Sequence, residues 1–260
     1  MAALELRALA GIPEILPGDD LASILQTALR ENDIELQPGD LLVVAQKIVS
    51  KAENQYVNLN DISPTEAAVL LGQEVDKDPR KVQVILNESN EVVRKRPGVL
   101  IVEHRLGFVA ANAGIDQSNI YQAGVDGDDL CLLLPLDPDA SAQALRRGIA
   151  DRLDIDVGVI INDSIGRAWR IGTVGLAIGV AGLTALEDYV GGTDIFGREL
   201  LVTQVAAADE LAAGASLVMG QTTEKAPVVL IRGYQPQAPS APELIGVKPL
   251  LRPKAMDMFR

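Results

Sequence analysis

Short, wholly apolar runs alternate with helical segments in this chain, and they restrict its fold more than any other feature. Three such runs are "LLVV" at 41–44, "VGVII" at 157–161 and "VVLI" at 228–231. Each is too short for a buried helix and is bounded by Gly, Pro or Asp, which is typical of buried strands. Amphipathic segments with a helical period lie between them. The pattern predicts an α+β fold, with mixed α/β elements in one compact unit over residues 1–260.

Caps and periodicity give the expected elements. Helices are expected at 18–32, 63–72, 78–95, 137–153 and 209–220. Their caps are Asp19 or Asp20 for the first, Ser63 in a capping box for the second, and Asp137 or Asp139 for the fourth. Strands are expected at 41–44, 156–162 and 227–233, and a hairpin at 98–104 with 106–112. The stretch after 41–44 carries two lysines and is expected to be a polar loop.

Composition argues against several classes of partner. The formal charge of −13 opposes adhesion to nucleic acid and to anionic membranes. The run "IGTVGLAIGVAGL" at 171–183 is shorter than the roughly 20 residues that span a bilayer, and the first residues lack the basic region of a signal peptide. We therefore expect a cytoplasmic protein. The same run predicts an ordinary buried strand or, alternatively, the closely packed core of a dimer.

The chain has one cysteine, Cys131, and one histidine, His104. The cysteine lies inside "LCLLLP", which predicts a buried structural thiol rather than a nucleophile. The histidine follows a predicted strand. With one histidine in the chain, the sequence offers neither a histidine-rich zinc site nor a pair of histidines, and we expect no Ser-His-Asp triad. We interpret the histidine as a strand-end residue, with a general base as the alternative. Any metal ion would then be held by oxygen ligands, which favours magnesium, manganese or calcium.

Polar clusters occur where strands are expected to end, and no P-loop or Rossmann glycine pattern is present. "NAGIDQSN" at 112–119 contains one acid, and "INDSIGRAWR" at 161–170 contains an acid, a hydroxyl and two arginines. An acid beside a hydroxyl suits a divalent ion, and guanidinium groups suit phosphate or carboxylate. Taken alone, each cluster favours a simple Asx-type turn. Likewise "QKIVSK" alone favours a solvated edge, and "VMGQTTEK" a loop.

Taken in order, longer motifs resemble the coenzyme F420:L-glutamate ligase family. They are "GIPEILPGDDL", "GDLLVVAQKIVSKAEN", "RLGFVAANAGIDQSN", "LLLPLDPDASA", "INDSIGRAWRIGTVGLAIGVAGL", "DIFGREL", "ADELAAGASLVMG" and "PVVLIRG". The likeness extends from about residue 7 to residue 235. The resemblance implies a stand-alone ligase domain that adds gamma-linked L-glutamate to the phospholactate carboxylate of the deazaflavin coenzyme F420-0. It also implies a homodimer.

The resemblance further implies site residues. Positions that contact GTP are matched by Ile12, Pro13, Glu14, Ile15, Gln46, Lys47, Lys51, Asn119, Gly220 and Gln221. Ligands of Mg²⁺ or Mn²⁺, with K⁺ as a further ion, are matched by Asp116, Asp163, Ser164 and Gln221. The sequence departs from the family in two places. Ala45 and Gln46 stand where many relatives carry hydroxyl residues before the motif lysine, and Gln221 stands where some carry an acid.

The chemistry of amide synthesis agrees with these residue types. A carboxylate must be activated before an amine attacks it, and the family's route is an acyl phosphate made from the γ-phosphate of GTP. Such a transfer needs neutralisation of charge and alignment, which divalent ions and Lys or Arg supply without a histidine. Arg167 and Arg170 are our candidates for holding the phosphoryl oxygens or the substrate carboxylate. Two alternatives are a related ligase with another carboxylate acceptor and a GTP-binding regulator without ligase activity.

Overall fold

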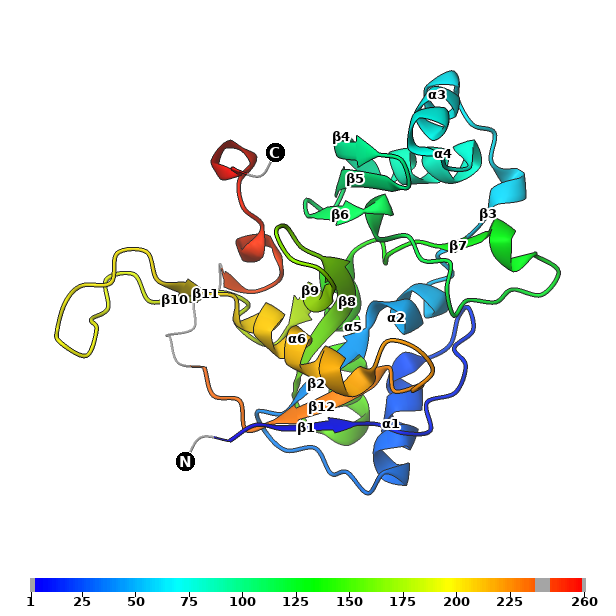
Figure 1. The fold of residues 1–260 in the computed structure, drawn as a ribbon. Coiled ribbons are helices and arrows are strands. Elements are labelled where there is room, and N and C mark those ends of the chain that lie inside the picture. Colours follow the sequence, from blue (N-terminus) through cyan, green and yellow to red (C-terminus); the bar gives the residue numbers. More distant parts are fainter. Residues whose placement is uncertain (1–2, 237–243, 259–260) are drawn as a thin grey trace.

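A five-stranded sheet forms the centre of the computed structural model, which describes residues 3–236 and 244–258 (Figure 1). The strands stand in the order β1-β12-β2-β8-β9. All neighbours are antiparallel except β2 and β8, which run parallel. Their bounds are β1 Glu5–Ala8, β12 Val228–Arg232, β2 Leu41–Ala45, β8 Gly158–Gly166 and β9 Thr173–Ala181. The three apolar runs are strands, as predicted, and the structure places them side by side.

Helices cover both faces of this sheet, which explains why its central strands are apolar throughout. Successive side chains of a strand point to opposite faces. In β2, Leu42 and Val44 pack toward α1 (Leu21–Glu31) and α5 (Pro138–Leu153), whereas Leu41 and Val43 pack toward α6 (Ala207–Met219). The helices expected at 18–32, 137–153 and 209–220 are confirmed, with Asp20 and Asp137 as the caps of the first two.

The strand β9 explains the small-residue run at 171–183. It packs between α5 and α6. A side chain at Gly175 would come within 2.5 Å of the carbonyl oxygen of Ala212 in α6, and one at Gly179 would collide with the backbone of Pro138 in α5. Glycine is needed because backbones approach closely here. In this chain the run is thus a buried strand, and the homodimer remains a prediction.

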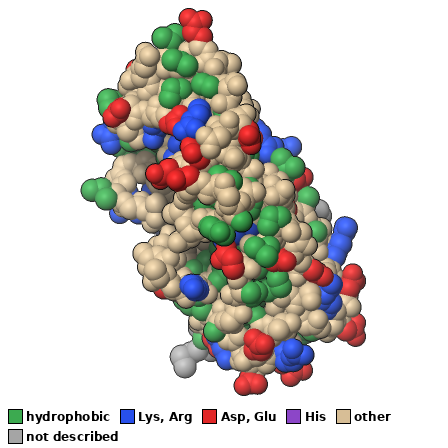
Figure 2. Space-filling view, turned by 90° about the vertical axis from the view of Figure 1, so that its right-hand side faces the viewer, with side chains coloured by type: hydrophobic (Ala, Val, Ile, Leu, Met, Phe, Trp, Pro, Cys, Tyr) green, Lys and Arg blue, Asp and Glu red, His purple; other side chains and the backbone are tan. Residues whose placement is uncertain are grey.

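A second group of elements forms a lobe with its own core, drawn in cyan and green at the upper right of Figure 1. It contains a three-stranded antiparallel sheet and, below it, a two-stranded one. The bounds are β3 Tyr56–Asn58, α3 Glu66–Val75, α4 Pro79–Asn87, β4 Ser89–Arg96, β5 Val99–His104, β6 Val109–Ala111 and β7 Leu130–Leu132. In the view of Figure 2, acidic and basic side chains are interspersed over the surface.

Two predictions for single residues are confirmed in this lobe, as is the predicted hairpin of β5 and β6. Cys131 is fully buried in β7. His104 is fully buried at the end of β5, where its ring stacks on Phe108 with 5.2 Å between centroids. Its Nδ1 atom accepts a hydrogen bond of 3.0 Å from the backbone N–H of Leu106. Both residues are therefore structural in position.

Four sequence predictions about local structure were wrong. The expected polar loop is the helix α2, Gln46–Ala52. The helix expected at 63–72 begins at Glu66 and is capped by Thr65 rather than Ser63, because Gln83 of α4 bonds both the N–H and the hydroxyl of Thr65. The helix expected at 78–95 ends at Asn87 and gives way to β4, which pairs with β5. The strand expected to end at 162 continues through Gly166, because β9 pairs with it that far.

A long arm leaves the body between two short strands, β10 (Glu187–Asp188) and β11 (Gln204–Val205), which pair antiparallel. Figure 1 shows it projecting at the left. Several apolar side chains on it are exposed, among them Ile195, Phe196 and Val202. At the base of the arm, Tyr189 and Tyr234 each donate a hydrogen bond of 2.6 Å to the buried carboxylate of Glu187.

Candidate active site

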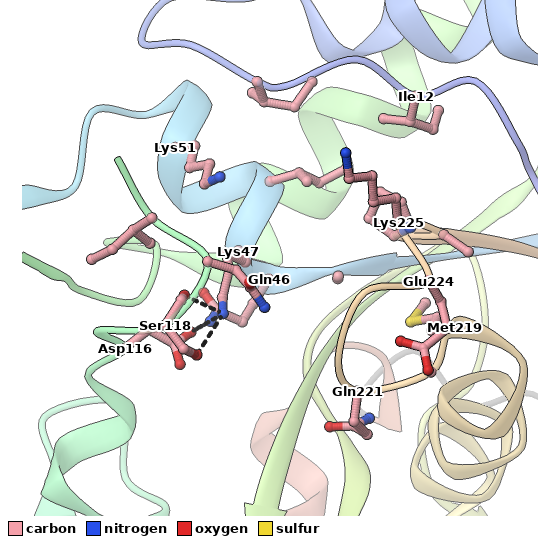
Figure 3. Close-up of a pocket in the computed structure, with 18 of the residues that line it drawn as sticks. Ile12, Gln46, Lys47, Lys51, Asp116, Ser118, Met219, Gln221, Glu224 and Lys225 are labelled. Atoms are coloured by element: carbon pink, nitrogen blue, oxygen red, sulfur yellow. Dashed lines mark hydrogen bonds and ion pairs between the residues drawn. The ribbon is translucent and has the colours of Figure 1, made fainter. Parts of the chain in front are cut away.

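A cavity of about 790 Å³ opens where the carboxyl end of β2, the strand β8 and three loops meet (Figure 3). Its lining residues come from five segments within 12–15, 45–51, 116–121, 162–164 and 219–227. The cavity therefore brings together residues from all four of the polar clusters and from the amino-terminal motif. The resemblance assigns thirteen positions to the site, and all of them line this cavity.

The helix α2 carries one wall of the cavity. Gln46 donates a hydrogen bond of 2.7 Å from its amide to the Asp116 carboxylate, and it accepts one of 2.9 Å from the hydroxyl of Ser50, one turn later. Lys47 donates a hydrogen bond of 2.9 Å to the carbonyl oxygen of Ser118 and lies 3.5 Å from the Asp116 carboxylate. Figure 3 shows these side chains converging on Asp116. Gln46 is thus a direct partner of the carboxylate.

Asp116 is held from the other side by the lobe. Its backbone exchanges hydrogen bonds of 3.0 and 2.9 Å with Leu132 of β7. Burial raises the pKa of the Asp116 carboxyl, and the nearby Lys47 and Gln46 oppose that rise only in part. A carboxylate whose charge is this poorly solvated is suited to a cation.

Asp163 lies on β8 and contributes a further carboxylate to the cavity. Burial and the negative charge of Asp116 together raise the pKa of Asp163 to about 7. The backbone N–H of Ser164 donates a hydrogen bond of 2.8 Å to it, which opposes the shift. Because the charge of Asp116 disfavours ionisation of Asp163, the two carboxyl groups form a site where a divalent cation would relieve the repulsion.

The loop that follows α6 closes the cavity. The hydroxyl of Ser164 donates a hydrogen bond of 2.8 Å to the amide oxygen of Gln221. Gly220 ends α6 with a φ of 73°, and a side chain on it would collide with Glu224. Asn119, also in a left-handed conformation, donates a hydrogen bond of 3.3 Å to the carbonyl oxygen of Thr222. The two loops are therefore tied to each other across the cavity.

A buried lysine lies deeper along α2. Lys51 is only 5% exposed, and its amine forms an ion pair with the carboxylate of Glu14, which is largely exposed. The pair joins the amino-terminal motif to α2. Because a carboxylate already occupies the place beside this ammonium group, the geometry suits a phosphate or another anion.

The two arginines predicted as catalytic are not among the lining residues. Arg167 and Arg170 lie in the turn between β8 and β9, and both are exposed. Arg167 donates a hydrogen bond of 2.9 Å to the carbonyl oxygen of Gly172 across this turn. The strand β8 is longer than expected, so Asp163 lies inside the strand rather than at its end. The turn that carries the two arginines therefore begins only after Gly166.

Sequence reasoning missed several residues that line the cavity. The most prominent are Tyr121, Glu224 and Lys225, and Asn162 is buried beside Asp163. Glu224 and Lys225 lie inside the motif "VMGQTTEK", but no role was predicted for either of them. No comparable sequence signal pointed to Tyr121, because the path of the folded chain decides whether a loop residue lines a cavity.

The donor set fits a hard divalent ion. Asp116, Asp163, Ser164 and Gln221 offer carboxylate, hydroxyl and amide oxygens, and the coupled carboxylates provide the negative charge. Within residues 3–236 and 244–258 there is no group of three or more His, Cys, Asp or Glu side chains that could hold a metal ion. A divalent ion here would therefore complete its coordination with water or with oxygens of a bound substrate.

Comparison with known proteins relates this site to a family. A family model described as F420-0:Gamma-glutamyl ligase matches residues 11–233. The chain is 46% identical over 250 residues to the coenzyme F420:L-glutamate ligase of Methanothermobacter thermautotrophicus, with 96% of each chain covered. It is 42% identical over 247 residues to the protein of that name from Methanopyrus kandleri, with 95% of this chain and 94% of the relative covered.

A third relative, the coenzyme F420:L-glutamate ligase of Archaeoglobus fulgidus, is 43% identical over 223 residues, with 86% of this chain and 85% of the relative covered. Among the described helices, all are too short or too polar to traverse a bilayer. The matched region contains every segment that lines the cavity. The chain therefore belongs to the F420-0:gamma-glutamyl ligase family.

Proposed function

We propose that this chain is a GTP-dependent and divalent-metal-dependent ligase that joins L-glutamate, through a gamma linkage, to the phospholactate carboxylate of coenzyme F420-0. Family membership supports the ligase activity and its place in coenzyme F420 biosynthesis. The observation that carries the finer proposal is the cavity itself. Its lining residues include Lys47, Lys51, the coupled carboxylates of Asp116 and Asp163, the Ser164 hydroxyl and the Gln221 amide oxygen.

The reaction proceeds in two steps in this proposal. A carboxylate oxygen of the acceptor attacks the γ-phosphorus of GTP, the bond to the β-phosphate breaks, and GDP leaves. The amine of glutamate then attacks the carbonyl carbon of the acyl phosphate, the bond to phosphate oxygen breaks, and inorganic phosphate leaves. The amine loses a proton to solvent, and an amide remains. Both steps depend mainly on alignment and on neutralising charge.

The residues of the cavity divide this work. Lys51 and Lys47 neutralise phosphate oxygens, with Lys51 exchanging Glu14 for the nucleotide. Asp116, Asp163, Ser164 and Gln221 hold the divalent ion, Mg²⁺ or Mn²⁺, with K⁺ as a further ion of the enzyme. When bound, the divalent ion supplies positive charge to phosphate oxygens during transfer. Gln46 keeps Asp116 oriented toward the cavity through its 2.7 Å hydrogen bond.

No histidine is required for these roles. His104 is fully buried in the lobe and is absent from the cavity lining. Phosphoryl transfer to a carboxylate needs no proton removal from the nucleophile, because the carboxylate is already ionised at neutral pH. The proposal also includes a homodimer acting in the cytoplasm, which sedimentation of the purified protein and localisation of a tagged copy would test.

Incubation with the deazaflavin phospholactate, GTP and L-glutamate tests the proposed function. We expect products heavier by successive glutamyl units in the mass spectrum and phosphate release that requires all three substrates. Replacing GTP by ATP should reduce turnover, and removing divalent ions with EDTA should abolish it. Nucleotide binding with no phosphate release on adding the acceptor would instead identify a regulator. Turnover only with a different carboxylate would identify a related ligase.

A further inference from the structure

The segment that carries Asp116 is attached to the lobe through the residue that follows it. Asp116 and Ser118 line the cavity, whereas Gln117 between them does not. Figure 3 shows Asp116 and Ser118 joined to Lys47 of α2. Gln117 is half-buried, and its side chain forms its hydrogen bonds with groups of the lobe. The segment therefore faces the cavity with two residues and the lobe with the one between them.

Hydrogen bonds at both ends of its amide hold the Gln117 side chain. The oxygen accepts a hydrogen bond from the amine of Lys81 in α4. The nitrogen donates to the carbonyl oxygens of Asp128, at 3.2 Å, and Leu130, at 3.5 Å, where β7 begins. A lysine ammonium group can only donate, so it selects the amide oxygen and leaves the nitrogen to face the two carbonyl groups. Lys81 thus fixes which way round this amide lies. We call these four residues the Gln117 clamp.

The clamp acts on the strand that holds Asp116. Leu132, two residues beyond Leu130 in β7, exchanges backbone hydrogen bonds of 3.0 and 2.9 Å with Asp116. The clamp and this exchange therefore tie neighbouring residues of one segment to the same short strand. Asp163 belongs to β8 of the central sheet instead. Loosening of the clamp would consequently change the position of the Asp116 carboxylate relative to Asp163.

Lys81 has no direct route to a ligand in the cavity. It is half-buried in the lobe and is not among the lining residues. A partly buried ammonium group needs an acceptor to offset the loss of water, and the Gln117 oxygen provides one. The contact that connects Lys81 to the site therefore runs through Gln117. The alternative is an effect of the Lys81 charge through space, which would not need Gln117.

We propose that Lys81 is a positioning residue for the metal site, which through Gln117 fixes the Asp116 carboxylate at the separation from Asp163 that a divalent ion requires. This assignment rests on the proposed function for the metal ion itself. Loss of a group that holds a metal ligand in place typically costs about 10- to 100-fold in metal affinity. Lys81 acts at one remove from the ligand, so we expect an effect at the lower end of that range.

Binding of Mn²⁺ tests the proposal without turnover. The electron paramagnetic resonance signal of free Mn²⁺ falls as the protein binds the ion, and Mn²⁺ alone is the probe. Lys81→Met, which keeps an unbranched side chain of similar length, should raise the Mn²⁺ dissociation constant about 10-fold. The matched control is Lys95→Met, which removes the same charge from the lobe by breaking the exposed 2.7 Å ion pair with Glu74 and should leave the constant unchanged. An unchanged constant in Lys81→Met would overturn the proposal.

A double substitution separates positioning from an effect of charge through space. Gln117→Leu should weaken Mn²⁺ binding by a similar factor, and adding Lys81→Met to it should have no further effect, because the lysine acts through Gln117. Effects that multiply in the double variant would show that the charge acts directly and would overturn the positioning role. Circular dichroism checks the fold of each variant. If Lys81→Met does not fold, Gln117→Leu carries the test by itself, and an unchanged constant there would overturn the proposal.

Turnover distinguishes positioning from a purely structural role. Lys81→Met should need more Mn²⁺ for half-maximal turnover and should recover most of the parent kcat when Mn²⁺ is saturating. A loss of kcat with an unchanged Mn²⁺ requirement would show that the substitution only damages the fold, and it would overturn the proposal.

The outcomes also separate this proposal from the function on which it rests. If the parent protein binds no Mn²⁺, the metal site of the proposed function fails and the role of Lys81 fails with it. If the parent binds Mn²⁺ but does not glutamylate the acceptor, the proposed reaction fails, and the Mn²⁺ titrations still decide the role of Lys81. If the parent binds Mn²⁺ and is active while Lys81→Met binds Mn²⁺ equally well, only the role of Lys81 fails.

Discussion

Ser164 on β8 donates a hydrogen bond of 2.8 Å from its hydroxyl to the amide oxygen of Gln221, which stands 57 residues later in the loop after α6. The bond turns that oxygen, the only atom of the Gln221 side chain that can ligate a cation, toward the strand of Asp163. It also fixes the loop against the sheet. The family relationship and this contact together make Gln221 the most informative position for testing the metal site.

Gln221→Glu should lower the Mn²⁺ concentration that gives half-maximal turnover, because a carboxylate adds a full negative charge to the oxygen ligands. Gln221→Ala should raise it. The measurement is a Mn²⁺ titration of turnover at saturating GTP for the parent and both variants. If the three curves coincide, Gln221 is not a ligand. A higher requirement in Gln221→Glu would mean that the new charge repels the nucleotide.

Asp116→Asn and Asp163→Asn should each reduce turnover by roughly a thousandfold or more, because loss of a charged ligand removes several kcal/mol of transition-state stabilisation. Circular dichroism should show an intact fold. The matched control is Asp151→Asn, which changes an exposed aspartate on α5 and should leave turnover unaltered. Near-parent activity in either cavity variant would exclude that aspartate from the site.

In the metal-free protein, ionisation of the Asp163 carboxyl should lower the free energy of unfolding, so that stability depends on pH. The pKa of this carboxyl in the folded protein, about 7, lies above the ordinary aspartate value of 3.8, so the folded protein binds this proton more tightly than the unfolded chain does. The resulting stabilisation is complete below about pH 4 and is lost as the pH rises through 7. In EDTA, Asp163→Asn should therefore be more stable than the parent at pH 8.

Urea unfolding of both proteins between pH 4 and pH 8 measures this effect. The advantage of Asp163→Asn over the parent should increase with pH and level off above pH 7, while Asp151→Asn should show no such trend. An advantage that is independent of pH would mean that the substitution acts through packing rather than through ionisation. Added Mn²⁺ should reverse the order at pH 8, because it binds and stabilises only the ionised parent.

Lys51→Met should raise the KM for GTP more than the KM for glutamate, because a lysine beside phosphate acts mainly as a point charge on that substrate. The methionine fits the buried position, and Glu14 is exposed enough to remain solvated without its partner. The control is Lys254→Met, which breaks the exposed ion pair with Glu91 and should change neither constant. Equal effects on both substrates would place Lys51 away from the nucleotide.

Gly179→Ala should destabilise the fold by about 1–3 kcal/mol, because the added methyl group would collide with the backbone of Pro138 at the start of α5. Thermal unfolding should show a lower Tm. Gly127→Ala is the matched control, since a side chain there would meet nothing within 4 Å and the glycine does not have a positive φ. An unchanged Tm for Gly179→Ala would show that β9 and α5 can separate at little cost.

Local patterns in the sequence determined much of the fold. The runs at 41–44 and 228–231 are strands because four consecutive apolar residues can be buried only where helices cover both faces of a sheet. Asp20 and Asp137 begin helices because their side chains accept hydrogen bonds from N–H groups three residues later. These interactions act within one turn or one strand, so the sequence alone reveals them.

Other features depend on partners that are remote in the sequence. Thr65 caps α3 because Gln83 bonds it from another helix, and β8 continues past Asn162 because β9 pairs with it. The alternative local conformations of these segments are close in free energy, so tertiary packing determines which one forms. No local pattern could distinguish those alternatives.

The same division holds for the candidate site. Motif order and family resemblance selected Asp116, Asp163 and Lys51, but only the tertiary structure brought them to one cavity. Asp116 is held by a backbone exchange with Leu132, and its charge acts on Asp163 across a buried space. Lys51 meets Glu14 from a different segment. Residue types and short-range periodicity are properties of the sequence, whereas electrostatic coupling depends on distance and burial, which exist only once the chain has packed.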